Sequence, residues 1–174
     1  MAAPLGYFSS VSQTGNFFLI QQLSPSAVST VTFSSIPATY KSLQVRFNLV
    51  TSASSTYFGL QMNGDTGANY AFHQLAGNGA AAYAGGGATQ NYGVINPALT
   101  VTTYPNVGIV DILDYANTNK NKTVKSIAGS NNNTSAGCIA IESDVWLSTA
   151  AITSLTLFIG SGTFTGTVTL IGIS

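Results

Sequence analysis

Apolar and polar residues alternate with a period of two in some segments of this chain, and the three-and-four spacing of a helix is hard to find. The clearest case is residues 41–52, where Leu43, Val45, Phe47 and Leu49 share one face of a strand and polar residues occupy the other. That pattern is typical of a sheet with one buried side.

The same reasoning predicts a chain of short strands separated by turns rich in Gly, Asn and Ser. Strands are expected near residues 17–23, 28–34, 41–52, 56–62, 69–76, 90–95, 105–115, 122–128, 137–147, 151–159 and 166–173. Many short strands without helices predict an all-β fold, a two-sheet antiparallel β-sandwich or a barrel. We favour the sandwich, with jelly-roll topology and an extended N-terminal arm.

The 174 residues fit one domain. Residues 1–24 are predicted to form the N-terminal arm and residues 25–174 a single β-sandwich domain. Residues 77–87, rich in Gly and Ala, are predicted to form a long flexible loop. The first residues lack the pattern of a signal peptide, and no apolar run approaches the ~18 residues of a membrane helix, so no membrane partner is expected.

Only 6% of the residues are charged, against about 25% in an ordinary domain. A surface of hydroxyls and amides has little electrostatic means of repelling copies of itself, which suits a protein that packs within an assembly. The formal net charge is zero, so nucleic acid is not an expected partner. Catalysis is not expected either, because proton transfer needs ionisable groups brought together.

The residues that could carry chemistry are few. His73 is the only histidine and Cys138 the only cysteine, which is too few for a catalytic triad with a visible partner or for a zinc site. We therefore expect no catalytic residue, no metal and no cofactor. His73 is interpreted as a strand histidine and Cys138 as a buried small residue.

Three groups of charges have separate interpretations. Glu142 and Asp144 lie two apart in a predicted strand and should share a face, as the two carboxylates of a glycosidase would, but solvated edge charges are the favoured interpretation. Asp111 and Asp114 lie three apart and should point to opposite faces. The lysines at 120, 122 and 125 are predicted to form a solvated loop tip.

Trp146 is predicted to lie in the core, although an exposed Trp could stack on a sugar ring. Residues 63–67, with the sequence NGDTG, are interpreted as a tight turn, because a calcium loop of the EF-hand type needs alternating acidic ligands and a closing glutamate.

Four stretches resemble a β-domain that is common in structural proteins of tailed bacteriophages. They are FSSIPATYKSL at 33–43, NGDTGANY at 63–70 with LAGNG at 75–79, WLSTAAITSLTL at 146–157, and GTFTGTVTLIGI at 162–173. The resemblance implies a virion structural protein without catalysis. Because no repetitive shaft precedes the domain, it favours a capsid decoration (cement) protein, which stabilises the head shell by binding across capsomers.

The expected partners are then the major capsid protein or other virion proteins, and the expected location is the virion, after synthesis in the host cytoplasm. A closed homo-oligomer, a trimer, would match a three-fold position on the shell. Apolar residues of the arm would add contact with a neighbour: Phe8, Phe17, Phe18, Leu19 and Ile20. Two alternatives stay open: a tail or fibre component that binds a host-surface glycan, and a free carbohydrate-binding module.

Overall fold

The computed structural model describes residues 16–99, 104–131 and 137–174, which form twelve β-strands and no helix. The strands are β1 (Phe17–Leu23), β2 (Thr30–Phe33), β3 (Ser42–Thr51), β4 (Thr56–Met62), β5 (Tyr70–Gly77), β6 (Ala82–Gln90), β7 (Gly93–Leu99), β8 (Asn106–Leu113), β9 (Lys122–Asn131), β10 (Gly137–Trp146), β11 (Leu155–Ile159) and β12 (Phe164–Ile173). The all-β fold predicted from the sequence is confirmed.

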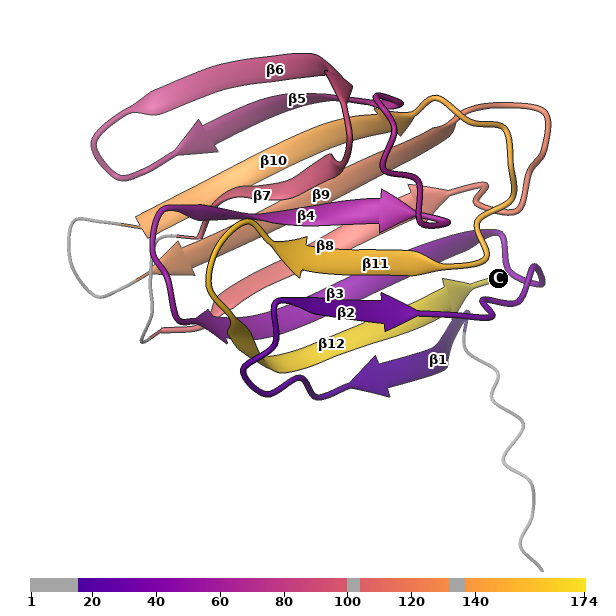
Figure 1. The fold of residues 1–174 in the computed structure, drawn as a ribbon, viewed down its shortest axis with the longest axis horizontal. Coiled ribbons are helices and arrows are strands. Elements are labelled where there is room, and N and C mark those ends of the chain that lie inside the picture. The colour runs from indigo at the N-terminus through magenta and orange to yellow at the C-terminus, as the bar shows by residue number, and fades with distance from the viewer. Residues whose placement is uncertain (1–15, 100–103, 132–136) are drawn as a thin grey trace, which may run out of the picture.

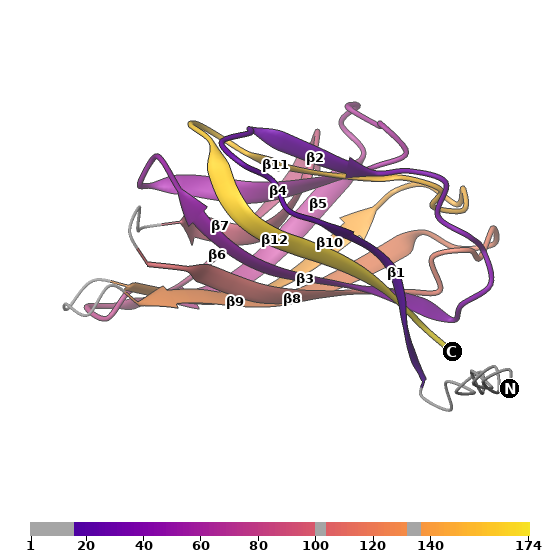
Figure 2. The ribbon, with the colours of Figure 1, turned by 90° about the horizontal axis from the view of Figure 1, so that it is seen from below.

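The strands build two antiparallel sheets that pack face to face as a β-sandwich (Figures 1 and 2). The large sheet has eight strands in the order β1-β12-β3-β8-β9-β10-β5-β6, and the small sheet has four in the order β2-β11-β4-β7. Within these, β1-β12-β3-β8 and β2-β11-β4-β7 are the two four-stranded sheets of a jelly roll. The hairpins β5-β6 and β9-β10 widen one of the two sheets.

The core lies between the sheets and follows the predicted alternation. Leu43, Val45, Phe47 and Leu49 of β3 all point inward and are buried, as the sequence predicted. From the small sheet, Phe58 packs its ring edge against Phe47 at a centroid distance of 5.1 Å. Each strand of the jelly roll thus contributes one face to a single core.

The N-terminal arm needs a correction. Residues 17–23 form β1, an edge strand that pairs with β12 from Phe17↔Ile173 to Leu23↔Val168. This agrees with the strand predicted at 17–23, but an arm that ends at residue 24 is wrong for these residues, because their backbone groups hydrogen-bond to the sheet. Residues 1–15 lie outside the described part of the chain.

The predicted glycine-rich loop also needs a correction. Residues 82–90 form β6, which pairs with β5 from Gly77↔Ala82 to Tyr70↔Gln90 and is the edge strand at the other end of the large sheet. Glycine and alanine carry no strand signal of their own, so the pairing with β5 decides the structure here.

Trp146 lies in the core, as predicted, with 3% of its surface exposed. Its ring stacks on Tyr70, and its Nε1 donates a 2.6 Å hydrogen bond to Oδ2 of Asp65. The Tyr70 hydroxyl donates to the Asp65 carbonyl oxygen and accepts from the amide of Met62. The hydrogen bond from Trp146 and a second from Asn69 lower the pKa of the Asp65 carboxyl. The NGDTGANY stretch therefore fixes the turn between β4 and β5 onto β10.

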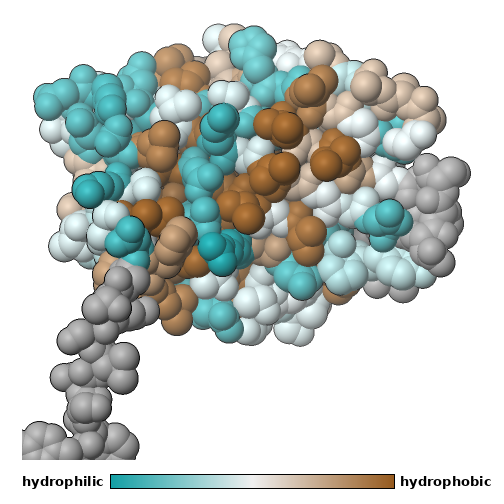
Figure 3. Space-filling view, turned by 180° about the vertical axis from the view of Figure 1, so that it is seen from behind, coloured by the Kyte–Doolittle hydropathy of each residue, from teal (hydrophilic) through white to brown (hydrophobic). Residues whose placement is uncertain are grey.

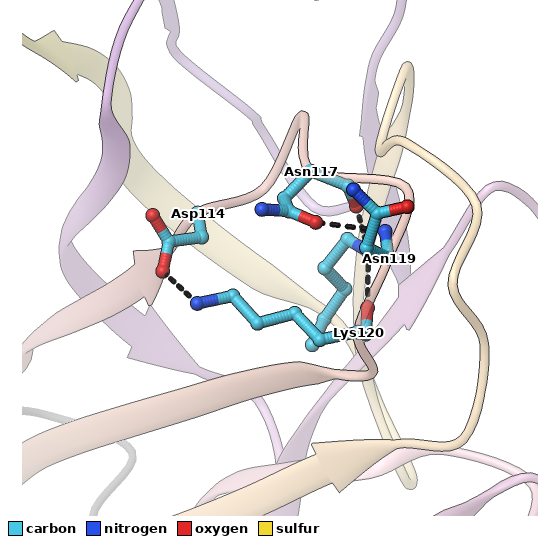
Figure 4. A network of polar contacts seen from close by, with 5 residues as sticks. Asp114, Asn117, Asn119 and Lys120 are labelled. Carbon is cyan, nitrogen blue, oxygen red and sulfur yellow. Dashed lines mark hydrogen bonds and ion pairs between the residues drawn. The ribbon is translucent and has the colours of Figure 1, made fainter.

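Lys122 contradicts the prediction of a solvated lysine tip. It is fully buried, and its ammonium donates to the carbonyl oxygens of Asn117, Lys120 and Thr149 at 2.6, 2.9 and 3.1 Å. Lys120 is exposed by contrast and forms an ion pair with Asp114 (Figure 4). Burial lowers the pKa of Lys122, but three acceptors hold its charge and join the turn after β8 to the loop after β10.

We expect Lys122→Met to lower the free energy of unfolding by about 2–4 kcal/mol, because three buried carbonyl oxygens lose their donor. Lys120→Met is the matched control and should cost under about 1 kcal/mol, since it removes an exposed ion pair. Urea unfolding of both variants at neutral pH measures the difference. Equal losses in the two variants would contradict the role given to Lys122.

Candidate interaction surface

The outer face of the large sheet carries a continuous strip of exposed aliphatic side chains. Strand register places Ile109 of β8 beside Ile127 of β9, Ile127 beside Ile141 of β10, and Ile141 beside Leu75 of β5. Because side chains alternate between the faces of a sheet, all four point away from the core. We call this row the aliphatic ladder.

A second row extends the ladder. Val107 of β8 and Ile139 of β10 lie on either side of Gly129 of β9, which has no side chain to fill the space between them. Across the two rows, the six aliphatic side chains are 38% to 61% exposed. The space-filling view in Figure 3, which shows the molecule from behind the view of Figure 1, has a connected apolar area on this face.

A broad open groove of about 750 Å³ lies over the second row and over the β8 and β9 members of the ladder. Its walls and floor are mainly apolar, with Val107, Ile109, Ile127 and Ile139 among them, and Arg46 at one side. A groove lined in this way binds by shape and desolvation of aliphatic carbon, since it offers few polar groups to orient a small ligand.

The row on the other side of the ladder is polar. Arg46 Nε donates to Oε1 of Gln44 at 2.7 Å, and Gln44 Nε2 donates to Oδ1 of Asp111 at 2.7 Å. Asp111 is in register with Lys125 of β9. Among the described residues, the only ion pair is the one between Lys120 and Asp114. Asp111 and Lys125 are therefore neighbours of opposite charge that do not form an ion pair within the chain.

The residues predicted to bind a partner lie partly on this face. Phe17 is 51% exposed, and the guanidinium carbon of Arg46 lies 5.7 Å from its ring centroid. Leu19 is 64% exposed, whereas Phe18 packs on Tyr40 and Ile20 packs against the core. Phe8 lies outside the described residues. Of the predicted set, Phe17 and Leu19 are therefore the exposed members.

Glu142 and Asp144 share a face as predicted, but that face is the interior, so the favoured interpretation as solvated edge charges is wrong. Both are at most 3% exposed. Oδ1 of Asp144 accepts the amide of Val94 at 2.7 Å, while no described residue donates to either Glu142 oxygen. Burial, with Asp144 nearby, raises the pKa of Glu142 to about 8; burial raises that of Asp144 to about 7, opposed by the Val94 amide.

The remaining candidates are separated from one another. His73 is exposed on the outer face of β5, and Cys138 is buried on the inner face of β10, where burial raises its thiol pKa. Asp111 belongs to β8 and Asp114 to the turn that follows, so they do not form a pair on one strand. Within the described ranges, no three His, Cys, Asp or Glu side chains are placed to hold a metal ion.

No protein-family model matches the chain, and no curated protein is similar to it. The described residues contain no helix long and apolar enough to cross a membrane.

The aliphatic ladder was missed at the sequence level, although a signal for it exists. In residues 105–115 and 137–147 apolar residues occupy both faces of the predicted strands, for example Ile109 beside Val110 and Ile141 beside Ala140. A sheet that is apolar on both sides has to be covered on both sides.

The buried acids predict a measurable pH dependence. Because the folded pKa of Glu142 is raised, the contribution of this group to stability is fully present below the unfolded value of 4.5 and is lost as the pH rises to about 8. We expect Glu142→Gln to flatten this slope and to raise the free energy of unfolding at pH 8 by a few kcal/mol. At pH 4 the variant and the wild type should unfold alike, because the carboxyl is then neutral in both states. Urea unfolding across this range tests the expectation, and an unchanged slope contradicts it.

Proposed function

We propose that this chain is a non-enzymatic structural subunit of a bacteriophage virion, a capsid decoration protein that stabilises the head shell by contact with neighbouring subunits. Its partners are the major capsid protein or other virion proteins, together with copies of itself. In this role the protein covers part of the capsid surface, and neighbouring subunits cover its own exposed apolar surface.

The observation that carries the proposal is the exposed aliphatic surface of the large sheet. Six aliphatic side chains that would be buried in an ordinary core are 38% to 61% exposed, and strand register holds them side by side. Full burial of such a side chain contributes about 1.5–3 kcal/mol, so covering six half-exposed ones contributes on the order of 5 kcal/mol. Contiguous apolar patches of this kind are typical of protein interfaces.

Two further properties support a structural role. Low charge leaves little long-range repulsion between like subunits, so many copies can lie close together. The two carboxyl groups that share a face, Glu142 and Asp144, are enclosed between the sheets, where burial favours their neutral forms. The assignment to a virion is based on the resemblance of four stretches of the sequence to structural domains of tailed bacteriophages.

One observation favours the alternative, a tail or fibre component that binds a host-surface glycan. On the outer face of the small sheet, the rings of Tyr57 and Tyr92 are parallel with centroids 4.9 Å apart, and Phe158 stands perpendicular to both. Aromatic faces are suited to stacking on sugar rings. All three rings are only partly exposed.

Binding to capsids tests the proposal. Capsids of the encoding virus, prepared from a deletion mutant that lacks this gene, are mixed with the purified chain and sedimented. We expect saturable binding with many copies per capsid, and greater resistance of the bound capsids to heat or chelator. Ile127→Asp together with Ile141→Asp should weaken binding, because two charges enter the apolar surface. Thr30→Asp, on the small sheet, is the matched control and should bind like the wild type.

Absence of binding to capsids at saturating protein concentration would overturn the decoration proposal. Binding to whole host cells that is lost after enzymatic removal of surface glycan, and that is reduced by Tyr92→Ala, would establish the alternative instead.

A further inference from the structure

The two central strands of the outer face have an unusual internal match. Three pairs of outward residues lie in register between β8 and β9: Val107 with Gly129, Ile109 with Ile127, and Asp111 with Lys125. The first pair joins a projecting side chain to a gap, the second joins two aliphatic side chains of equal size, and the third joins opposite charges. The two members of each pair therefore match each other in shape, size or charge.

A two-fold axis converts this match within one chain into a match between two chains. If the axis lies in the plane between two facing sheets, along the strands and between β8 and β9, every β8 residue faces its own β9 partner from the other copy. Val107 then enters the hollow above Gly129, Ile109 packs on Ile127, and Asp111 meets Lys125. Symmetry makes each contact twice, as in any isologous interface.

We propose that the outer face of the large sheet binds a second copy of this chain, in a two-fold pair centred between β8 and β9. The inference rests on the proposed function in that the molecule acts through protein contact, and it names the partner at this surface. It replaces the three-fold arrangement expected from the sequence with a two-fold one.

The size of the face is sufficient for a stable pair. Eight strands spaced about 4.8 Å apart extend about 34 Å, and a ten-residue strand is about 33 Å long, which gives a face of roughly 1,100 Å². A standard interface buries about 800 Å² per partner. Two sheets that pack face to face cross at about 30°, so register is best kept near the axis, where the three pairs lie.

The charges on the face favour a second copy over an unrelated apolar partner. Neither Asp111 nor Lys125 is in an ion pair within the described residues, and an apolar partner would remove both charges from water with only the hydrogen bond from Gln44 to Asp111 as compensation. A second copy supplies one opposite charge to each of them. The same symmetry sets Arg46 of β3, one strand from the axis, opposite the partner's Ile141, with its guanidinium carbon 5.7 Å from the Phe17 ring centroid.

Charge exchange provides the experiment. Sedimentation equilibrium of the full chain should show a reversible dimer for the wild type. Asp111→Lys alone sets two lysines opposite each other on either side of the axis, and Lys125→Asp alone sets two aspartates there, so each variant should dimerise at least about tenfold more weakly. A mixture of the two single variants restores both opposite-charge contacts, and we expect it to form a heterodimer of about wild-type affinity.

Two measurements keep the result interpretable. Far-UV circular dichroism and thermal unfolding should show that both single variants fold like the wild type, since both side chains lie on the outer face. Thr30→Lys, which adds a charge on β2 of the small sheet, should leave dimerisation unchanged.

A wild-type chain that stays monomeric at high micromolar concentration would overturn the inference, as would a dimer that neither single variant weakens or a mixture that fails to recover. These outcomes are separate from the capsid test. A dimer that does not bind capsids would support the two-fold pair and contradict the decoration function. A monomer that binds capsids would contradict the two-fold pair and support the decoration function.

Discussion

The structure depends on one constraint: the large sheet is apolar on both of its faces, and the small sheet can cover only one of them. Residues such as Val110 and Val124 complete the core between the sheets, while Ile109 and Ile127 on the same strands point outward. Water must be excluded from the inner face for the chain to fold, and the same physical force acts on the outer face after folding. In the association that we propose, the strands that bury their inner face in the core would bury their outer face against a second subunit.

The interior of the widened sheet is held by polar contacts as well as by packing. Lys122 joins two loops through three carbonyl oxygens, and Asp65 joins the β4–β5 turn to Trp146. Asn63 acts in the same way, since its side-chain oxygen accepts the amides of Thr153 and Ser154. The stretches that resemble bacteriophage domains are thus largely structural. They specify how turns are fixed to the sandwich, and this is why such motifs can indicate a fold without indicating a ligand.

Period-two alternation was sufficient to predict the all-β class and the inward residues of β3, because burial of one face decides those positions. It was insufficient where side chains carry little signal. β6, with three consecutive glycines, is a strand only because β5 offers a hydrogen-bonding edge. Charge also misled: Lys122 and Glu142 are interpreted as solvated from residue type alone, and their burial depends on strand parity and on segments distant in the sequence.

The outer face could have been predicted in part, since apolar residues on both faces of a strand are visible in the sequence. What the sequence could not show is which outward residues become neighbours, because this depends on the register between strands β8 to β10 and β5. Register turns scattered isoleucines into a ladder and sets Asp111 beside Lys125. On a surface with so few charges, a single opposite-charge pair has little competition from other charges. In the proposed dimer, the same scarcity of charge would allow this one pair to determine how the two subunits are oriented.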